Sequence, residues 1–148
     1  MRFTIRRADA TDIDEILAFL DEGLRRDYFL RRGILRCWIT GDNGDGTWRR
    51  PGCVLLAEAE GETVGIAIMS ERSSRLFNLF VHPEWRGKGV GRKLLEACSP
   101  RTVRVKRDMS SGDPAGFYRR MGYIPEPYAE GYIQVWTREP MLPIGRGK

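Results

Sequence analysis

The segment LFVHPEWRGKGVGRKLLEAC, residues 79–98, constrains the fold more than any other part of the sequence. An apolar strand ends at a His-Pro pair, and three glycines at alternate positions, Gly87, Gly89 and Gly91, then lead into an amphipathic stretch. The first turn of a helix leaves about four N–H groups without intrahelical partners and carries a partial positive charge. Glycine lets a ligand approach that backbone closely. The segment therefore predicts a strand, a turn and a helix, with an anion-binding site at the turn.

The charge distribution agrees with an anionic ligand. Four basic residues surround the glycines: Arg86, Lys88, Arg92 and Lys93. The chain has 25 Lys+Arg against 20 Asp+Glu, a net charge of +5, and residues 101–148 hold nine basic residues against five acidic ones. Such a bias favours a polyanionic partner, either nucleic acid or a phosphorylated small molecule. The P-loop pattern is missing, and a dinucleotide fingerprint G-x-G-x-x-G would need glycine where Arg92 stands.

Periodicity in the rest of the chain predicts one layered domain over residues 1–148. Alternating or continuous apolar runs predict strands at 3–8, 53–59, 63–69, 75–81, 102–106 and 132–137. Apolar residues at helical spacing, together with cap and proline signals, predict helices near 13–24, 25–38, 89–98 and 115–121. Thr11 stands where the first helix needs an N-cap, and 41–52 has the composition of a loop. The resulting order, β-α-α-β-β-β-α-β-α-β, indicates an α/β or α+β fold.

Two motifs resemble those of the GNAT superfamily of N-acetyltransferases. Arg86-x-x-Gly89-x-Gly91 is similar to its acetyl-CoA motif, and AGFYRRMGY at 115–123 is similar to its second signature, a helix ending in Phe-Tyr-x-x-x-Gly-aromatic. The resemblance implies a mixed, mostly antiparallel central sheet with helices on both faces. It also implies a cofactor core at about 53–123, with acceptor-side elements at about 11–52 and 124–140.

The resemblance further implies that acetyl-CoA is the co-substrate and that no metal is needed. Backbone groups of Leu79, Phe80 and Val81 would pair with the pantetheine arm. The pyrophosphate would be held by the turn and the first helical residues: Arg86, Gly87, Lys88, Gly89, Val90, Gly91 and Arg92.

The implied reaction is direct acyl transfer to a primary amine of a small molecule or peptide. Tyr118 matches the tyrosine that protonates the departing thiolate, a role that suits a phenol because it keeps its proton at neutral pH. Two positions depart from the family pattern: Asn78 stands where many members have an acidic general base, and Gly112 where many have an asparagine that contacts the cofactor. One of three glutamates, Glu58, Glu71 or Glu130, could act through water instead, or the substrate amine could lose its proton without a dedicated base. The base stays unassigned.

Two other functions remain open. The departures at Asn78 and Gly112 fit a CoA-binding module that has lost its chemistry. Arginines at 25, 26, 31, 32, 36, 49 and 50, with Trp38 and Trp48 nearby for stacking, could form a nucleic-acid-binding face. Neighbouring acidic residues neutralise most of that charge, and no RNA- or DNA-binding signature accompanies it, so nucleic acid is the less favoured partner.

The remaining features concern the cysteines, the single histidine and the expected cellular location. Cys37, Cys53 and Cys98 are odd in number without C-x-x-C spacing, which argues against a disulfide framework or a zinc site and favours small buried side chains. His82, the only histidine, has no nucleophile elbow to serve and is expected to hydrogen-bond locally. No apolar run reaches the roughly 20 residues that cross a bilayer. We expect a cytoplasmic protein without a membrane partner; homodimers are common in the family, and one is an open alternative here.

Overall fold

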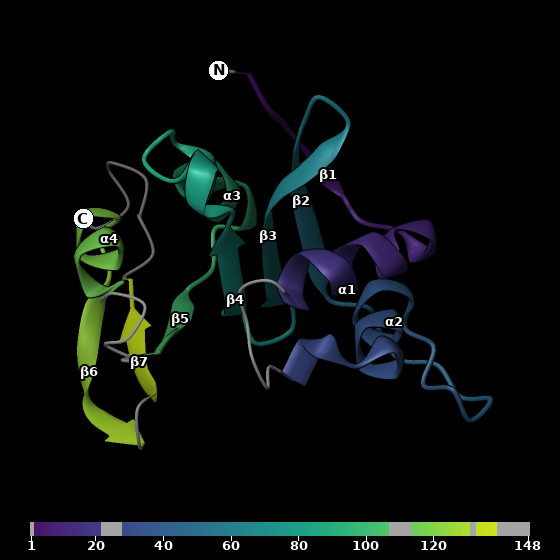
Figure 1. The fold of residues 1–148 in the computed structure, drawn as a ribbon. Coiled ribbons are helices and arrows are strands. Elements are labelled where there is room, and N and C mark those ends of the chain that lie inside the picture. Colours follow the sequence, from purple (N-terminus) through teal and green to yellow (C-terminus); the bar gives the residue numbers. More distant parts are fainter. Residues whose placement is uncertain (1, 22–27, 107–113, 131–132, 139–148) are drawn as a thin grey trace, which may run out of the picture. The chain divides into compact units, whose positions relative to one another are not determined.

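The computed structural model describes residues 2–21, 28–106, 114–130 and 133–138. The chain forms two compact units, Met1–Ser99 and Pro100–Lys148. The ribbon in Figure 1 labels the elements of both units, which are taken in turn below. The subdivision into a cofactor core at 53–123 and acceptor-side elements stays a prediction.

The first unit is built on four antiparallel strands in the order β1 (Thr4–Arg7), β2 (Cys53–Ala59), β3 (Glu62–Ser70) and β4 (Arg75–Val81). The tight turn between β2 and β3 uses Glu60 at φ 54° and Gly61 at φ 80°. Two successive residues at positive φ match the right-handed twist of the flanking strands. All four strands fall at predicted positions.

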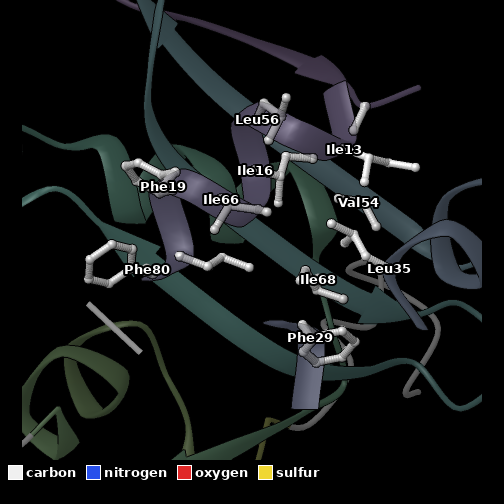
Figure 2. Packing of buried hydrophobic residues seen from close by; sticks show 12 residues of the cluster. Ile13, Ile16, Phe19, Phe29, Leu35, Val54, Leu56, Ile66, Ile68 and Phe80 are labelled. Carbon is white, nitrogen blue, oxygen red and sulfur yellow. The ribbon is translucent and has the colours of Figure 1, made fainter. Parts of the chain in front are cut away.

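Helices α1 (Ile13–Asp21) and α2 (Arg32–Thr40) cover one face of this sheet. Ile13, Ile16 and Leu20 repeat at helical spacing and are almost fully buried, and Phe19 meets Phe80 of β4 with ring centroids 5.1 Å apart. Figure 2 shows how the two helices and the sheet share one apolar cluster. Its other labelled members are Phe29, Leu35, Val54, Leu56, Ile66 and Ile68.

Helix α3 (Val90–Cys98) covers the opposite face of the same strands. A Cβ built on Gly65 of β3 would lie 2.8 Å from Val90 Cγ1 and 3.0 Å from Leu94 Cδ1. Only glycine therefore lets α3 pack this closely on the sheet. Helices lie on both faces of this sheet, as predicted.

Two boundary predictions in the first unit are wrong. The N-cap is Asp9, not Thr11: its carboxylate accepts a hydrogen bond from Thr11 N, and Asp12 Oδ2 accepts one from Asp9 N at 2.8 Å. This reciprocal capping box begins a short 3-10 turn, η1 (Ala10–Asp12), which runs into α1. The helix predicted over 25–38 is also divided, because Arg31 is extended (φ −96°, ψ 125°) between η2 (Tyr28–Leu30) and α2.

The second unit contains β5 (Thr102–Lys106), α4 (Ala115–Arg120), β6 (Ile124–Glu130) and β7 (Ile133–Thr137), with antiparallel strands in the order β5-β7-β6. Strand β6 was not predicted, because its sequence IPEPYAE carries two prolines that cannot donate to a ladder. Its register with β7 is irregular between Pro125 and Ala129. The fold is of the α+β class, with mostly antiparallel strands.

Two of the three cysteines are buried as expected, Cys53 at 6% and Cys98 at 8% exposure, whereas Cys37 is only partly buried. None of the helices in the described ranges is long and apolar enough to cross a membrane.

Candidate functional site

The turn from β4 to α3 is fixed by local hydrogen bonds and by two glycines. His82 Nδ1 accepts a hydrogen bond from Glu84 N at 3.1 Å and so caps a 3-10 turn, η3 (Pro83–Trp85), which confirms the local role expected for this histidine. Gly87 then lies at φ 76° and Gly89 at φ 88°. Side chains rarely adopt this left-handed conformation, so glycine is required at both positions.

The backbone at the start of α3 is open to a ligand. Gly89 is the N-cap and has no side chain to bond the N–H groups of the first turn. The N–H of Lys93 is already satisfied, since it donates to Gly89 O at 3.0 Å. A Cβ built on Gly87 or Gly89 would find nothing within 4 Å, so the space in front of this backbone is empty. The turn can therefore bring several N–H donors to one anion.

Side chains add positive charge to this turn. Lys88 is exposed and has no acidic partner within 4.0 Å among the described residues. Arg92 and Lys93 share Glu96, at 3.3 and 4.0 Å. These pairs are exposed and so hold the side chains only weakly.

Arg86 helps to shape the turn. Its Nε donates to Val81 O at 3.1 Å, and its guanidinium lies 5.9 Å from the centroid of the Phe80 ring. The first residue of the motif thus ties the turn back to the end of β4, while the remaining guanidinium N–H groups stay available as donors.

The last three residues of β4 lead directly into the turn. Leu79 and Val81 are half-buried, whereas Phe80 is buried. They pair with β3 in the register Ala67↔Leu79, Ile66↔Phe80 and Gly65↔Val81. In an antiparallel ladder alternate backbone groups point away from the partner strand. The ten residues predicted to bind the cofactor thus lie in one continuous strand end, turn and helix start.

Tyr118 lies on α4 in the second unit and is only 6% exposed. Its ring packs edge-on against Phe117, with centroids 5.1 Å apart, and Tyr123, at 6.1 Å. Burial in this aromatic surrounding raises the pKa of the Tyr118 phenol above its ordinary value, and the neighbouring Tyr123 contributes to the rise. The phenol is therefore protonated at neutral pH and can act only as a proton donor.

Asn78, which stands where many family members have an acidic general base, is buried. Asn78 is 7% exposed and faces the same side of the sheet as its partner Ile68 and as Phe80. An amide avoids the cost of burying a carboxylate charge there. Gly112 lies outside the described residues.

Two of the three glutamates considered as bases are bound to arginine. Glu58 lies 2.7 Å from Arg6 Nε, and Arg6 also reaches Asp12 at 2.6 Å, which lowers the pKa of that aspartate. Glu71 lies 2.8 Å from Arg7. The side chain of Glu130 lies outside the described part of the chain. Both carboxylates are thus already engaged by arginine side chains.

Some of the features considered for nucleic acid lie together, since Arg31, Arg36, Arg49 and Trp38 line one hollow beside α2. Trp38 is partly buried and packs edge-on against Phe29 and Phe77, at centroid distances of 5.1 and 5.3 Å, whereas Trp48 is 68% exposed. Arg32 is paired with Asp14. Within the described ranges, no group of three or more His, Cys, Asp or Glu side chains could hold a metal ion.

Solved structures confirm the fold. PaiA N-acetyltransferase from Thermoplasma acidophilum, in complex with coenzyme A, superposes with a TM-score of 0.69 at 17% identity, covering 95% of this chain and all of that one. The ribosomal-protein-S18-alanine N-acetyltransferase from Escherichia coli superposes with a TM-score of 0.65 at 14% identity, covering 91% of this chain and 90% of that one. These two likenesses show the fold that this chain shares with them.

Sequence similarity shows the family directly. The acetyltransferase (GNAT) domain family matches residues 50–125, a range that contains the glycine turn and Tyr118. An uncharacterized N-acetyltransferase of Archaeoglobus fulgidus is 32% identical over 107 residues, which cover 62% of this chain and 68% of that protein. The chain belongs to the GNAT family of N-acetyltransferases, so the predicted family and enzyme class are confirmed.

Proposed function

We propose that this chain transfers the acetyl group of acetyl-CoA to a primary amine. The observation that carries the proposal is the N-cap of α3: Gly89 offers no side chain to the N–H groups of the first turn, and a Cβ at Gly87 or Gly89 would meet nothing within 4 Å. A pyrophosphate is the anion that such a turn holds best, because several N–H donors and the helix dipole act on it together.

The residues of the turn fit coenzyme A. The N–H groups from Gly87 to Arg92 bind the pyrophosphate, with Arg86 and Lys88 adding charge. The backbone of Leu79, Phe80 and Val81 binds the pantetheine arm as an added strand. The complex of the Thermoplasma protein with coenzyme A supports this choice of cofactor.

Bound acetyl-CoA supplies a thioester carbonyl carbon for attack. The neutral amine forms the new C–N bond there, the C–S bond breaks, and its electron pair leaves with the sulfur. Tyr118 donates its phenolic proton to that sulfur, and the product is an N-acetylated amine with free CoA thiol. Burial of Tyr118 supports this role, because it keeps the proton in place until a thiolate develops.

The proposal includes no protein base. Asn78 cannot accept a proton, and arginine holds Glu58 and Glu71 in ion pairs. Glu130, whose side chain lies outside the described part of the chain, is given no role here, and we propose that the amine loses its proton to water before it attacks. The three free cysteines fit the reducing conditions of the cytoplasm, where we place the reaction.

Thermal unfolding with acetyl-CoA, CoA, ATP and NADH tests the cofactor. At 100 times its Kd a ligand stabilises the fold by ~2.7 kcal/mol. That corresponds to a rise in Tm of roughly 5–10 °C for a domain of this size. A rise with the CoA species alone supports the proposal, and equal shifts with ATP or NADH contradict it.

Transfer itself needs a separate assay. Release of CoA thiol in the presence of a panel of amines distinguishes the enzyme from a CoA-binding module without chemistry. The buried amide at Asn78 is the feature that favours the module. Binding of acetyl-CoA without thiol release for any amine would establish the module.

A further inference from the structure

A hollow lies at the end of the β3–β4 pair that is opposite to the glycine turn. At one end, Gly65 pairs with Val81, next to the glycine turn; at the opposite end, Ser70 pairs with Arg75. Beyond Ser70 a cleft of about 460 Å³ opens between the end of α2, the segment 49–52 and the β3–β4 turn. Its lining includes Trp38, Arg49, Arg50, Gly52, Glu71 and Arg72.

Positive charge dominates this arginine cleft. Three arginines line it, against the single carboxylate of Glu71. That carboxylate is held by Arg7 at 2.8 Å, and Arg50 approaches it only to 3.9 Å. Within the described residues, neither Arg49 nor Arg72 has an acidic partner within 4.0 Å. Two guanidinium groups thus remain available to an anion from outside.

The wall that carries Arg49 and Arg50 is built into the fold. Arg49 N donates to Gly41 O at 2.8 Å, and Gly52 N donates to Trp38 O at 2.8 Å. A Cβ built on Gly52 would lie 2.5 Å from the Trp38 ring and 3.0 Å from Met69 O. The segment is therefore clamped between α2 and the end of β3. Guanidinium groups on a fixed backbone lose less entropy when they bind.

The cleft lies within reach of an acceptor. A pantetheine arm that runs from the turn along Val81 to Leu79 brings its thioester close to Asn78. Asn78 pairs with Ile68, and Glu71 follows three residues later on the same strand and turn. At about 3.3 Å per residue, the cleft begins about 7–10 Å beyond the thioester.

We propose that the arginine cleft binds an anionic group of the acceptor, so that this enzyme selects primary amines carrying a carboxylate or phosphate about 7–10 Å from the nitrogen. Guanidinium forks match both anions through paired N–H···O bonds. The inference deepens the proposed function and rests on it, because it assigns the acceptor of the same reaction.

The acceptor series that tests it varies only the terminal group. ω-Amino carboxylic acids and ω-aminoalkyl phosphates of matching length are compared with ω-amino carboxamides, which are neutral. We expect kcat/KM to be at least tenfold higher for the anionic acceptors. The double variant Arg49→Gln/Arg72→Gln should lower this ratio toward one, through a lower kcat/KM for the anionic acceptors. The better of the two anion types identifies the group that the cleft takes.

A matched control removes the same kind of charge elsewhere. Arg2 is exposed and lies outside the cleft, so Arg2→Gln should preserve the tenfold ratio. Equal kcat/KM for charged and neutral acceptors in the wild type would overturn the inference. A ratio that survives in the double variant would overturn it equally.

A binding measurement separates this inference from the proposed function. Inorganic phosphate and glutarate should raise the Tm of the wild type and of Arg2→Gln, and not that of the double variant. Absence of this difference overturns the anion site even if acetyl-CoA binds and amines are acetylated. The opposite outcome is a Tm difference with phosphate or glutarate but no binding of acetyl-CoA. That result would refute the proposed function and the role of the cleft in acceptor choice, while supporting the anion site itself.

Discussion

The two ends of the β3–β4 pair carry the two proposed binding surfaces, which are of opposite kinds. At the glycine turn the donors are backbone N–H groups, and the side chains of Gly87 and Gly89 are reduced to hydrogen so that a ligand can reach them. At the arginine cleft the proposed donors are the side chains of Arg49, on the segment clamped beside α2, and Arg72, on the β3–β4 turn. A surface made of backbone depends on φ angles, whereas one made of side chains depends on residue identity. The first tolerates few substitutions, and the second can change its ligand by changing one residue.

The largest expected effect comes from Gly89→Val. The change forces a branched residue into φ 88° and puts its methyl groups into the open space in front of α3. We expect acetyl-CoA affinity to fall more than a hundredfold, measured by calorimetric titration.

Gly44→Val is the matched control for this change. Gly44 lies at φ 83° with nothing within 4 Å of a built Cβ, so it suffers the same backbone strain far from the turn. Both variants should lose about 1–2 kcal/mol of stability. Normal CoA affinity in Gly89→Val would refute the backbone-built pyrophosphate site.

Tyr118→Phe should have the next largest effect, on turnover rather than binding. Removing a general acid lowers kcat by about 10²–10⁴-fold. The Kd for acetyl-CoA should stay the same, because the phenol acts on the leaving group. Stopped-flow measurement of CoA thiol release gives kcat.

Tyr123→Phe supplies the comparison for a structural tyrosine. The hydroxyl of Tyr123 donates to Pro100 O, so its loss should cost about 1–3 kcal/mol of stability and leave kcat unchanged. A Tyr118→Phe enzyme with wild-type kcat would place Tyr118 in the same structural class.

The contrast between a site built of backbone and one built of side chains also explains what could be predicted from the sequence. The glycine turn was predictable because glycine, proline and arginine spacing directly encode φ angles and helix starts. Strand β6 was not, since Pro125 and Pro127 obscure the pattern of a strand whose pairing is irregular. The N-cap was misplaced because Asp9 and Thr11 are both good caps. Only the reciprocal hydrogen bond that Asp12 Oδ2 accepts from Asp9 N decides between them.

The arginine cleft was only partly predictable: the sequence analysis grouped Arg49 and Arg50 with Trp38, but not with Arg72. Arg49 and Arg72 are 23 positions apart, and nothing in the local pattern of either predicts that they share a hollow. Their association depends on the ladder between β2 and β3, which brings Gly52 next to the end of β3. Side-chain sites assembled across a sheet require the register, which a single sequence leaves open.

Titration of the Tyr118 phenol should have a smaller effect, on the free energy of unfolding. The pKa of Tyr118 is raised in the folded state, so above about pH 10 the unfolded chain releases this proton while the folded chain keeps it. The free energy of unfolding should therefore fall with rising pH more steeply in the wild type than in Tyr118→Phe. Urea unfolding between pH 9 and 11 measures the difference; parallel curves would show that Tyr118 is not buried in a raised-pKa state.

The smallest effect concerns the one carboxylate in the arginine cleft. Glu71→Gln removes a charge that faces Arg50 at 3.9 Å and frees Arg7 from its 2.8 Å ion pair. Since the pair is largely exposed, the stability cost should be below about 1 kcal/mol. Removing a negative charge a few ångströms from a bound anion should raise phosphate affinity about fivefold, because two charges about 4 Å apart in water interact by about 1 kcal/mol.

Glu60→Gln makes the same change at the other end of β3 and should leave phosphate affinity unaltered. If both variants raise the affinity equally, the cleft responds to net charge alone and the local arrangement of Arg49 and Arg72 is not what binds the anion.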